Sequence, residues 1–139
     1  MKKKHVLSQL ESDVYCQLKP SEIGGVGVFA LRDIPKGINP FKEKDTKYFP
    51  VREEYIEGLD SNVRDYVKKL FVYSDGKYWL PKHGVQTLCI THYLNHSKNP
   101  NLTTNSNCDV FFTIKDVKRG EELTINYNLF DDAKEEFRR

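Results

Sequence analysis

The sequence predicts a mostly β single domain that carries one short helical insert. Its 139 residues fit one hydrophobic core of ordinary size. Short runs of β-branched, aromatic or alternating residues are bounded by Gly, Pro and Asp turn signals, which indicates many short strands. One longer stretch, about residues 51–71, repeats its apolar residues every three or four positions, which is the period of a helix.

The composition is that of a globular protein and leaves its partners open. Hydrophobic residues make up 38% of the chain and charged residues 30%, and 8 Tyr and 8 Phe supply enough aromatic mass for a core. The net charge of +2 is too small to indicate a nucleic-acid-binding protein by itself. The acidic residues of the insert could face a basic peptide or only water.

Cysteine spacing and hydropathy indicate an intracellular protein without a metal site. Cys16, Cys89 and Cys108 are widely spaced and form no C-x-x-C pair, so we expect reduced thiols, no disulfide framework and no metal. The basic start at residues 1–4 is not followed by the apolar stretch of a secretion signal, and no run is long enough to span a membrane. We expect a cytoplasmic or nuclear location and no membrane partner.

The first part of the chain predicts a flexible start followed by two strands. Residues 1–12 are basic and then polar, which favours a loose start. In residues 14–19, Val14, Cys16 and Leu18 alternate with their neighbours, as in a half-buried strand. Three glycines come next, before a short apolar strand. They either form a structural turn or let a ligand approach the backbone closely.

Two later segments share the pattern basic, Asp, apolar, any residue, basic, Gly. They are residues 32–37 and residues 115–120, and each lies between two apolar strands. We expect the same turn used twice and no domain repeat. Residues 39–47 are polar and are expected to loop out, with Phe41 as the one residue that packs.

The helical stretch and the hairpin after it carry clear boundary signals. Gly58 is expected to split the helix, and Asp60 or Ser61 is suited to cap its second piece. Asp75-Gly76, between aromatic and β-branched residues, predicts a two-residue hairpin.

The last third predicts two more strands, at residues 110–115 and 122–127, joined by the second of the repeated turns. Residues 131–139 form a charged tail with helical propensity.

The most polar stretch of the chain is Tyr-Leu-Asn-His-Ser-Lys-Asn-Pro-Asn at residues 93–101, directly after an apolar-rich run. Asn and His side chains carry both donors and acceptors and could fix the polar edges of a ligand. Asn and Pro are also ordinary loop formers. The stretch alone leaves both interpretations open.

Three separated segments together resemble the motifs of the SET-domain protein lysine methyltransferases. Residues 21–37, a Gly-rich turn leading into Val-Phe-Ala-x-x-Asp-Ile-Pro-x-Gly, resemble the first motif. Residues 93–101 resemble Asn-His-Ser-x-x-Pro-Asn, and residues 120–127 resemble Gly-Glu-Glu-Leu-Thr-x-Asp-Tyr. Each motif alone has low specificity, but all three occur in the family's order and spacing. The chain is similar to the minimal single-domain members of viruses and bacteria.

The resemblance implies the SET-domain fold, with several small twisted β-sheets in a catalytic domain at residues 13–130. In that fold the last motif threads beneath the loop of the second motif, a knot-like crossing. We therefore expect residues 123–128 to pass beneath residues 92–101, and the cofactor and the substrate lysine to enter from opposite faces.

The resemblance also implies S-adenosyl-L-methionine as the cofactor. The backbone of Gly25, Val26 and Gly27 would receive its amino-acid end, where a side chain would block close approach. Asn95 would bind polar groups of the cofactor through its side chain, and His96 would bond the adenine edge through its backbone.

The end of the sequence predicts that the cofactor site is covered by hydrophobic side chains and not by a zinc-binding tail. No Cys follows Cys108 to build the zinc-binding tail that follows many of these domains. Leu129 and Phe130 are therefore expected to cover the adenine.

By the same resemblance Tyr127 is the catalytic residue. A free lysine has a pKa of about 10.4, and only its neutral amine is nucleophilic. A dry aromatic channel beside a sulfonium disfavours the ammonium form, and the Tyr127 hydroxyl then orients the amine without acting as a strong base. Asn126 stands where the family has Asp, which removes a charge and keeps the capacity for hydrogen bonds.

Four further residues are expected to line the channel of the substrate lysine: Phe41, Tyr93, Thr104 and Ile125. Ile125 stands where members often carry a Tyr or Phe that limits methylation, and Thr104 stands at the position that some members use instead. The channel then lacks an extra Tyr hydroxyl, which predicts room for a second or third methyl group.

The implied activity is methyl transfer to the side-chain amine of lysine in a protein or peptide, with a histone as one candidate. The alternative is a catalytically weak SET-like module that binds a peptide or the cofactor without turnover, which Asn126 and the missing tail favour. Nucleic acid is expected to matter only through chromatin. Some minimal members form homodimers, and a viral or bacterial member would be delivered to a host cell.

Overall fold

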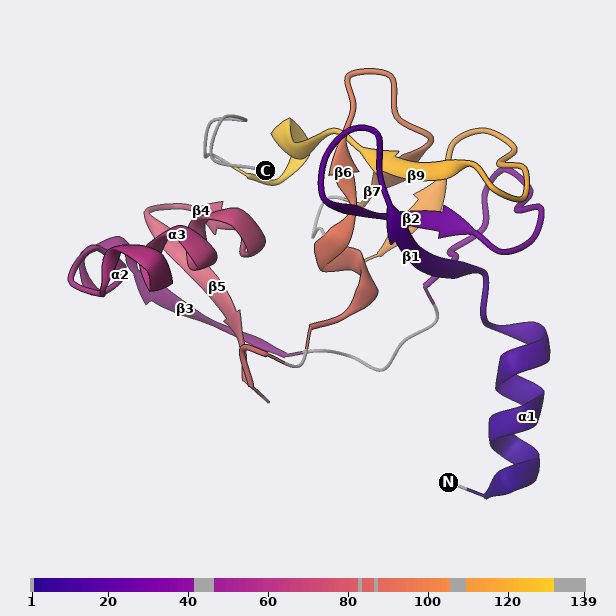
Figure 1. Ribbon diagram of the computed structural model, residues 1–139, viewed down its shortest axis with the longest axis horizontal. Helices are drawn as coiled ribbons and strands as arrows, with labels where there is room; N and C mark the ends of the chain where they lie inside the picture. Colours follow the sequence, from indigo (N-terminus) through magenta and orange to yellow (C-terminus); the bar gives the residue numbers. More distant parts are fainter. Residues whose placement is uncertain (1, 42–46, 83, 87, 106–109, 132–139) are drawn as a thin grey trace.

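Three small β-sheets and a few short helices make up the computed structural model, which describes residues 2–41, 47–82, 84–86, 88–105 and 110–131 (Figure 1). The first half of the chain contains α1 (Lys3–Ser12), β1 (Cys16–Pro20), β2 (Val26–Ala30), β3 (Tyr48–Arg52), α2 (Glu53–Glu57), α3 (Ser61–Leu70) and β4 (Tyr73–Ser74). The second half contains β5 (Lys77–Pro81), the 3-10 helix η1 (Ile90–Tyr93), β6 (Asn95–His96), β7 (Leu102–Thr104), β8 (Phe111–Thr113), β9 (Glu122–Ile125) and the 3-10 helix η2 (Tyr127–Leu129). The predicted mostly β fold with a helical insert is confirmed.

The main sheet brings the three sequence motifs side by side, in the strand order β1-β2-β9-β6 (Figure 1). β1 and β2 form an antiparallel hairpin, and β2 continues antiparallel to β9 with Val28 opposite Leu123. β6 joins the other edge of β9 in parallel, with Asn95 opposite Thr124. A parallel pair requires a long connection between its strands, so this contact could not arise from a local turn.

The main core lies against this sheet, and partly buried aromatic side chains pack around it. Its buried residues are Cys16, Val28, Ala30, Ile34, Leu94, Leu102, Val117, Leu123, Ile125 and Tyr127. Only Cys16 of β1 is buried, whereas Leu18 is exposed, so the predicted inward alternation of Val14, Cys16 and Leu18 is wrong. β1 is an edge strand, and the core reaches only the end of it that faces Ala30.

The two repeated turns pack against each other. Ile34 and Val117 exchange backbone hydrogen bonds of 2.7 and 2.8 Å. The Asp of each turn accepts a hydrogen bond from a backbone N–H of the other turn, from Arg119 to Asp33 at 2.8 Å and from Lys36 to Asp116 at 2.9 Å. The final glycines have φ of +86° and +90°, the left-handed conformation that the pattern predicts. The shared motif is therefore one turn used twice, in a reciprocal pair.

The insert forms its own small core, in which α2 and α3 pack on the sheet β3-β5-β4. Its buried residues are Ile56, Val67, Phe71 and Tyr78. Gly58 ends α2, and the Asp60 side chain caps α3 by accepting from the Asn62 N–H at 3.2 Å, as predicted. Val51 lies in β3, so the predicted helix from residue 51 begins too early.

The Val51 error has a simple physical reason. Val51 pairs with Tyr78 across the sheet and packs on the insert core from a strand. A β-branched residue suits that environment, and apolar spacing alone cannot distinguish it from the first turn of a helix. The Asp75-Gly76 hairpin is confirmed, with both residues at positive φ.

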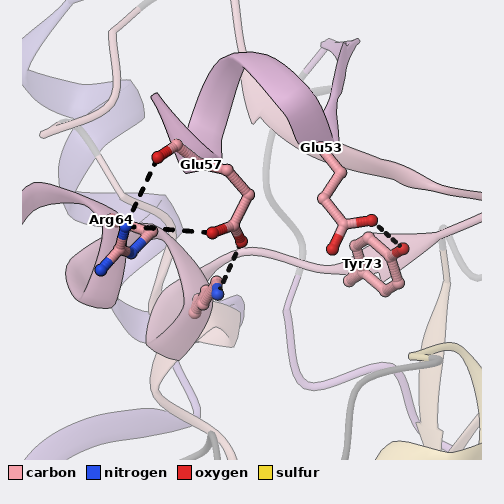
Figure 2. A network of polar contacts seen from close by, with 5 residues as sticks. Glu53, Glu57, Arg64 and Tyr73 are labelled. Carbon is pink, nitrogen blue, oxygen red and sulfur yellow. Dashed lines mark hydrogen bonds and ion pairs between the residues drawn. The ribbon is translucent and has the colours of Figure 1, made fainter. Parts of the chain in front are cut away.

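A network of polar contacts joins α2 to the neighbouring elements of the insert (Figure 2). The Glu57 carboxylate pairs with Lys68 at 2.8 Å and with Arg64 at 3.9 Å. The Tyr73 hydroxyl donates to Glu53 at 2.7 Å. These contacts join residues of neighbouring elements within the insert.

The predicted loose start at residues 1–12 differs from the structure, in which Lys3–Ser12 forms helix α1. No residue of α1 is buried, and the helix projects away from the sheets (Figure 1). Its residues are mostly good helix formers. The Arg32 guanidinium donates to the Glu11 carbonyl at 2.6 Å and to the Leu10 carbonyl at 3.3 Å. These bonds supply hydrogen-bond donors to two carbonyls in the last turn of the helix.

The end of the described chain is packed. Asp131 is buried and its carboxylate accepts from the Tyr73 N–H at 3.4 Å. The remainder of the predicted charged tail, residues 132–139, lies outside the described residues.

The predicted strands at 110–115 and 122–127 are found as the shorter β8 and β9, and β8 pairs with β7 rather than with β9. No helix in the described ranges is both long and apolar enough to cross a membrane.

Candidate active site

The Gly-rich turn before β2 presents an open backbone at Gly25. Gly25 has φ +54°, and a Cβ built there would meet no atom within 4 Å. Its carbonyl accepts from the Ser21 N–H at 2.9 Å, which closes the turn. A ligand can approach the backbone of Gly25, whereas a side chain at this position would be strained.

Gly27 is needed for a different reason. A Cβ on Gly27 would overlap the carboxylate of Glu122 and would lie 3.0 Å from Nδ2 of Asn95. The space that the glycine leaves is thus filled by the protein's own side chains. The prediction that a side chain here would block a ligand is refined, because it would first displace Glu122 and Asn95.

Asn95 and Glu122 tie the Gly-rich turn to β6 and β9. Asn95 is 1% exposed, and its Nδ2 donates to Oε2 of Glu122 at 2.8 Å, with longer contacts to the carbonyls of Gly24 and Val26. The other carboxylate oxygen of Glu122 accepts from the Ser21 hydroxyl at 2.6 Å. The side chain of Asn95 therefore points into the turn that the sequence predicts to receive the cofactor.

A second buried amide, Asn101, holds β9 in place. Its Nδ2 donates to the Glu122 carbonyl at 2.8 Å, and its Oδ1 accepts from the Thr124 N–H at 2.9 Å. The Ser97 N–H donates to the Ile125 carbonyl at 3.0 Å. The polar loop and β9 are therefore in direct contact, as expected, while the threading of one beneath the other stays a prediction.

Tyr127 is fixed at both its backbone and its hydroxyl. It is 7% exposed, its N–H donates to Nδ1 of His96 at 3.0 Å, and its hydroxyl donates to the Leu94 carbonyl at 2.5 Å. Because Nδ1 accepts this bond, the neutral imidazole of His96 carries its proton on Nε2. The imidazole of His96 thus positions Tyr127, a role that the sequence did not predict.

A row of aromatic rings runs past Tyr127. The ring of Tyr127 lies 5.1 Å from that of His96 and 6.2 Å from that of Phe130. Phe130 continues to Phe111 at 6.5 Å, and Phe111 to Phe41 at 6.1 Å, both edge to face. Tyr127, His96, Phe130 and Phe41 are thus brought together from segments distant in sequence.

The other three predicted channel residues occupy different positions. Tyr93 ends η1 and packs, half-buried, on the main core. Thr104 lies opposite Phe111 across the β7–β8 pair, with its hydroxyl donating to the Val110 carbonyl at 2.8 Å. Ile125 is fully buried, two residues before Tyr127 in sequence and opposite His96 across the sheet.

Sequence reasoning gave no site role to Glu122, Ser21 and Phe111. Glu122 lies in the last motif, and an acidic residue at the start of a strand that is otherwise buried was its available signal. The contact of Ser21 depends on the order of the sheet, which a single sequence does not display. Phe111 could have been found as an aromatic residue in a predicted strand.

A nucleophilic role for Cys16 and a metal site find no support in the described residues. Burial raises the pKa of the Cys16 thiol to about 12, so it stays protonated. In the described residues, no group of three or more His, Cys, Asp or Glu side chains is placed to hold a metal ion.

Comparison with known proteins agrees with this geometry. A crystal structure from Plasmodium falciparum, named as a candidate histone methyltransferase, matches with a TM-score of 0.50 and 19% identity. The match covers 82% of this chain and 93% of that chain, and at this identity it shows a common fold. No curated protein matches. The sequence model of the SET domain matches residues 25–128, from the Gly-rich turn to the residue after Tyr127. Because this match spans most of the sequence, the chain belongs to the SET domain family.

Proposed function

We propose that this protein transfers a methyl group from S-adenosyl-L-methionine to the side-chain amine of a lysine in a protein or peptide. Membership of the SET domain family supports methyl transfer in general. The observation that carries the proposal is Tyr127, whose hydroxyl and backbone are both held beside a row of aromatic rings.

The residues around the Gly-rich turn fit the amino-acid end of S-adenosyl-L-methionine. The backbone at Gly25 is open to approach, and Asn95 presents a buried amide to the inside of the turn. His96 and Phe130 both place rings next to Tyr127, and such aromatic surface suits the flat adenine of the cofactor. When bound, S-adenosyl-L-methionine supplies an electrophilic methyl group on a sulfonium.

Tyr127 orients the lysine amine by accepting a hydrogen bond. The hydroxyl proton is donated to the Leu94 carbonyl, so the phenol oxygen faces other groups as an acceptor. An amine N–H that donates to this oxygen directs the nitrogen lone pair elsewhere, toward the methyl group. An in-line displacement at about 3 Å depends mainly on such positioning.

The aromatic row favours the neutral form of the amine. Phe41, Phe111 and Phe130 offer hydrophobic surface, which disfavours an ammonium group by desolvation. Ile125 and Thr104 add no phenol hydroxyl to the proposed channel of the substrate lysine. We therefore propose that the channel accommodates a lysine with two or three methyl groups.

The test is methylation of a peptide array, including histone tails, with labelled S-adenosyl-L-methionine, followed by mass spectrometry of the products. Wild type is expected to give di- or trimethyl-lysine. Tyr127→Phe should lower the turnover about 100-fold, because the positioned oxygen is lost. The matched control is Tyr66→Phe, which removes a hydroxyl that bonds the Val85 carbonyl in the insert and should leave turnover unchanged.

Two results would contradict the proposal. Equal incorporation by wild type and Tyr127→Phe would indicate the catalytically weak binding module. Products that stop at monomethyl-lysine would contradict the inferred room for further methyl groups.

A further inference from the structure

The carboxylate of Glu122 is held beneath the Gly-rich turn by two neutral donors. Oε1 accepts from the Ser21 hydroxyl at 2.6 Å, and Oε2 accepts from Nδ2 of Asn95 at 2.8 Å. The carboxylate rests on the bare backbone face of Gly27, where any side chain would overlap it. Three segments therefore converge to fix one acidic group at this point.

This arrangement leaves a negative charge without a positive partner inside the described part of the chain. Glu122 is half-buried, and no basic side chain of the described residues forms an ion pair with it. The two neutral donors orient the carboxylate without pairing its charge, so a cation that joins it would form a charge-assisted hydrogen bond. Each carboxylate oxygen has more than one lone pair, so both can accept a further hydrogen bond.

We propose that Glu122 is a cofactor-binding residue whose carboxylate receives the α-ammonium group at the amino-acid end of S-adenosyl-L-methionine. The proposal rests on the proposed function, in which the turn at Gly25 and Gly27 receives that end. The absence of a side chain at position 27 lets the Glu122 carboxylate lie directly against the backbone, and the open backbone of Gly25 belongs to the same turn. The site then selects ligands with a free amino group.

The first test needs no variant. Wild-type protein is titrated by calorimetry with S-adenosylhomocysteine and with its deamino analogue, in which hydrogen replaces the α-amino group. A charge-assisted hydrogen bond predicts that the deamino analogue binds about 10- to 100-fold more weakly. Equal affinities would overturn the role of Glu122 and leave the proposed function standing.

The second test uses Glu122→Gln, which keeps the size of the side chain and one acceptor but removes the charge. S-adenosylhomocysteine should bind more weakly to this variant, and the ratio between the two ligands should fall to about threefold or less. The matched control is Glu121→Gln. The Glu121 side chain is exposed and accepts from the Lys118 N–H, so the ratio should stay as in wild type.

A purely structural role gives a different result. It would weaken the binding of both ligands to Glu122→Gln by the same factor, and an unchanged ratio would overturn the inference. If the variant does not fold, the ratio measured with wild type still decides. If wild type binds neither ligand, the proposed function fails and the inference fails with it.

Discussion

The main sheet and the insert use polar side chains in opposite ways. In the main sheet, buried amides reach across to strands that are distant in sequence, as Asn101 does to β9 and Asn95 to the Gly-rich turn. In the insert, partly exposed ion pairs such as Glu57 with Lys68 join elements only a few residues apart (Figure 2). A buried hydrogen bond fixes geometry and is costly to break, whereas an exposed ion pair contributes little.

This difference separates the part of the molecule that carries the proposed site from the part that does not. The amides of the main sheet align the Gly-rich turn, β6 and β9, which carry all the proposed cofactor contacts except Phe130. The insert has its own core and contributes none of them. Substitutions of matched chemistry in the two regions should therefore have very different effects.

Asn101→Ala should produce the largest effect. It leaves the Glu122 carbonyl and the buried Thr124 N–H without the Asn101 side chain, and unmade hydrogen bonds of this kind cost about 3 kcal/mol in total. The free energy of unfolding, measured in urea, should fall by that amount. The matched control is Asn62→Ala in the insert, an exposed residue of α3 whose loss should change stability by less than about 0.5 kcal/mol. Equal effects at the two positions would remove the distinction between the regions.

Gly27→Ala should come next, with a loss of about 2 kcal/mol. The new methyl group overlaps the Glu122 carboxylate and must displace it or Asn95, as in an overpacked core. The matched variant is Gly25→Ala, where space is open and only the left-handed backbone is strained, at about 1 kcal/mol. Thermal unfolding together with calorimetry of S-adenosylhomocysteine should show that Gly27→Ala loses both stability and binding. Retention of wild-type affinity by Gly27→Ala would show that the Glu122 and Asn95 contacts do not shape the site.

The sequence predicts well those features whose chemistry is local. Gly58 and Asp60 mark the helix boundaries of the insert, and Asp75-Gly76 marks its hairpin, because each residue acts within its own turn. The repeated turn also follows from its residues. Its packing against its own copy does not, since the bonds from Arg119 and Lys36 to the two Asp side chains depend on the tertiary fold.

The site itself was only partly predictable. The motifs predict Tyr127, Asn95 and His96 as site residues, but the bond from the Tyr127 backbone to the His96 imidazole depends on the parallel pairing of β6 with β9. The role of Glu122 does not follow from the sequence for the same reason, because its partner Ser21 is 101 residues away. A single sequence contains no signal for such a pairing.

The smallest expected effect is that of Glu57→Gln in the insert. The hydrogen bond from Lys68 lowers the pKa of the Glu57 carboxyl below its ordinary value, with Coulombic help from Lys68 and Arg64. A carboxyl whose pKa is lower in the folded state stabilises the protein above its unfolded pKa, and this stabilisation is lost as the pH falls through the folded pKa. The urea midpoints of wild type and Glu57→Gln should therefore differ slightly at pH 7 and converge as the pH falls through the lowered folded pKa of Glu57. Because the Glu57 side chain is exposed to water, the difference at pH 7 should be far smaller than that of Asn101→Ala. A difference of similar size would mean that the surface pairs of the insert carry as much weight as the buried amides of the main sheet.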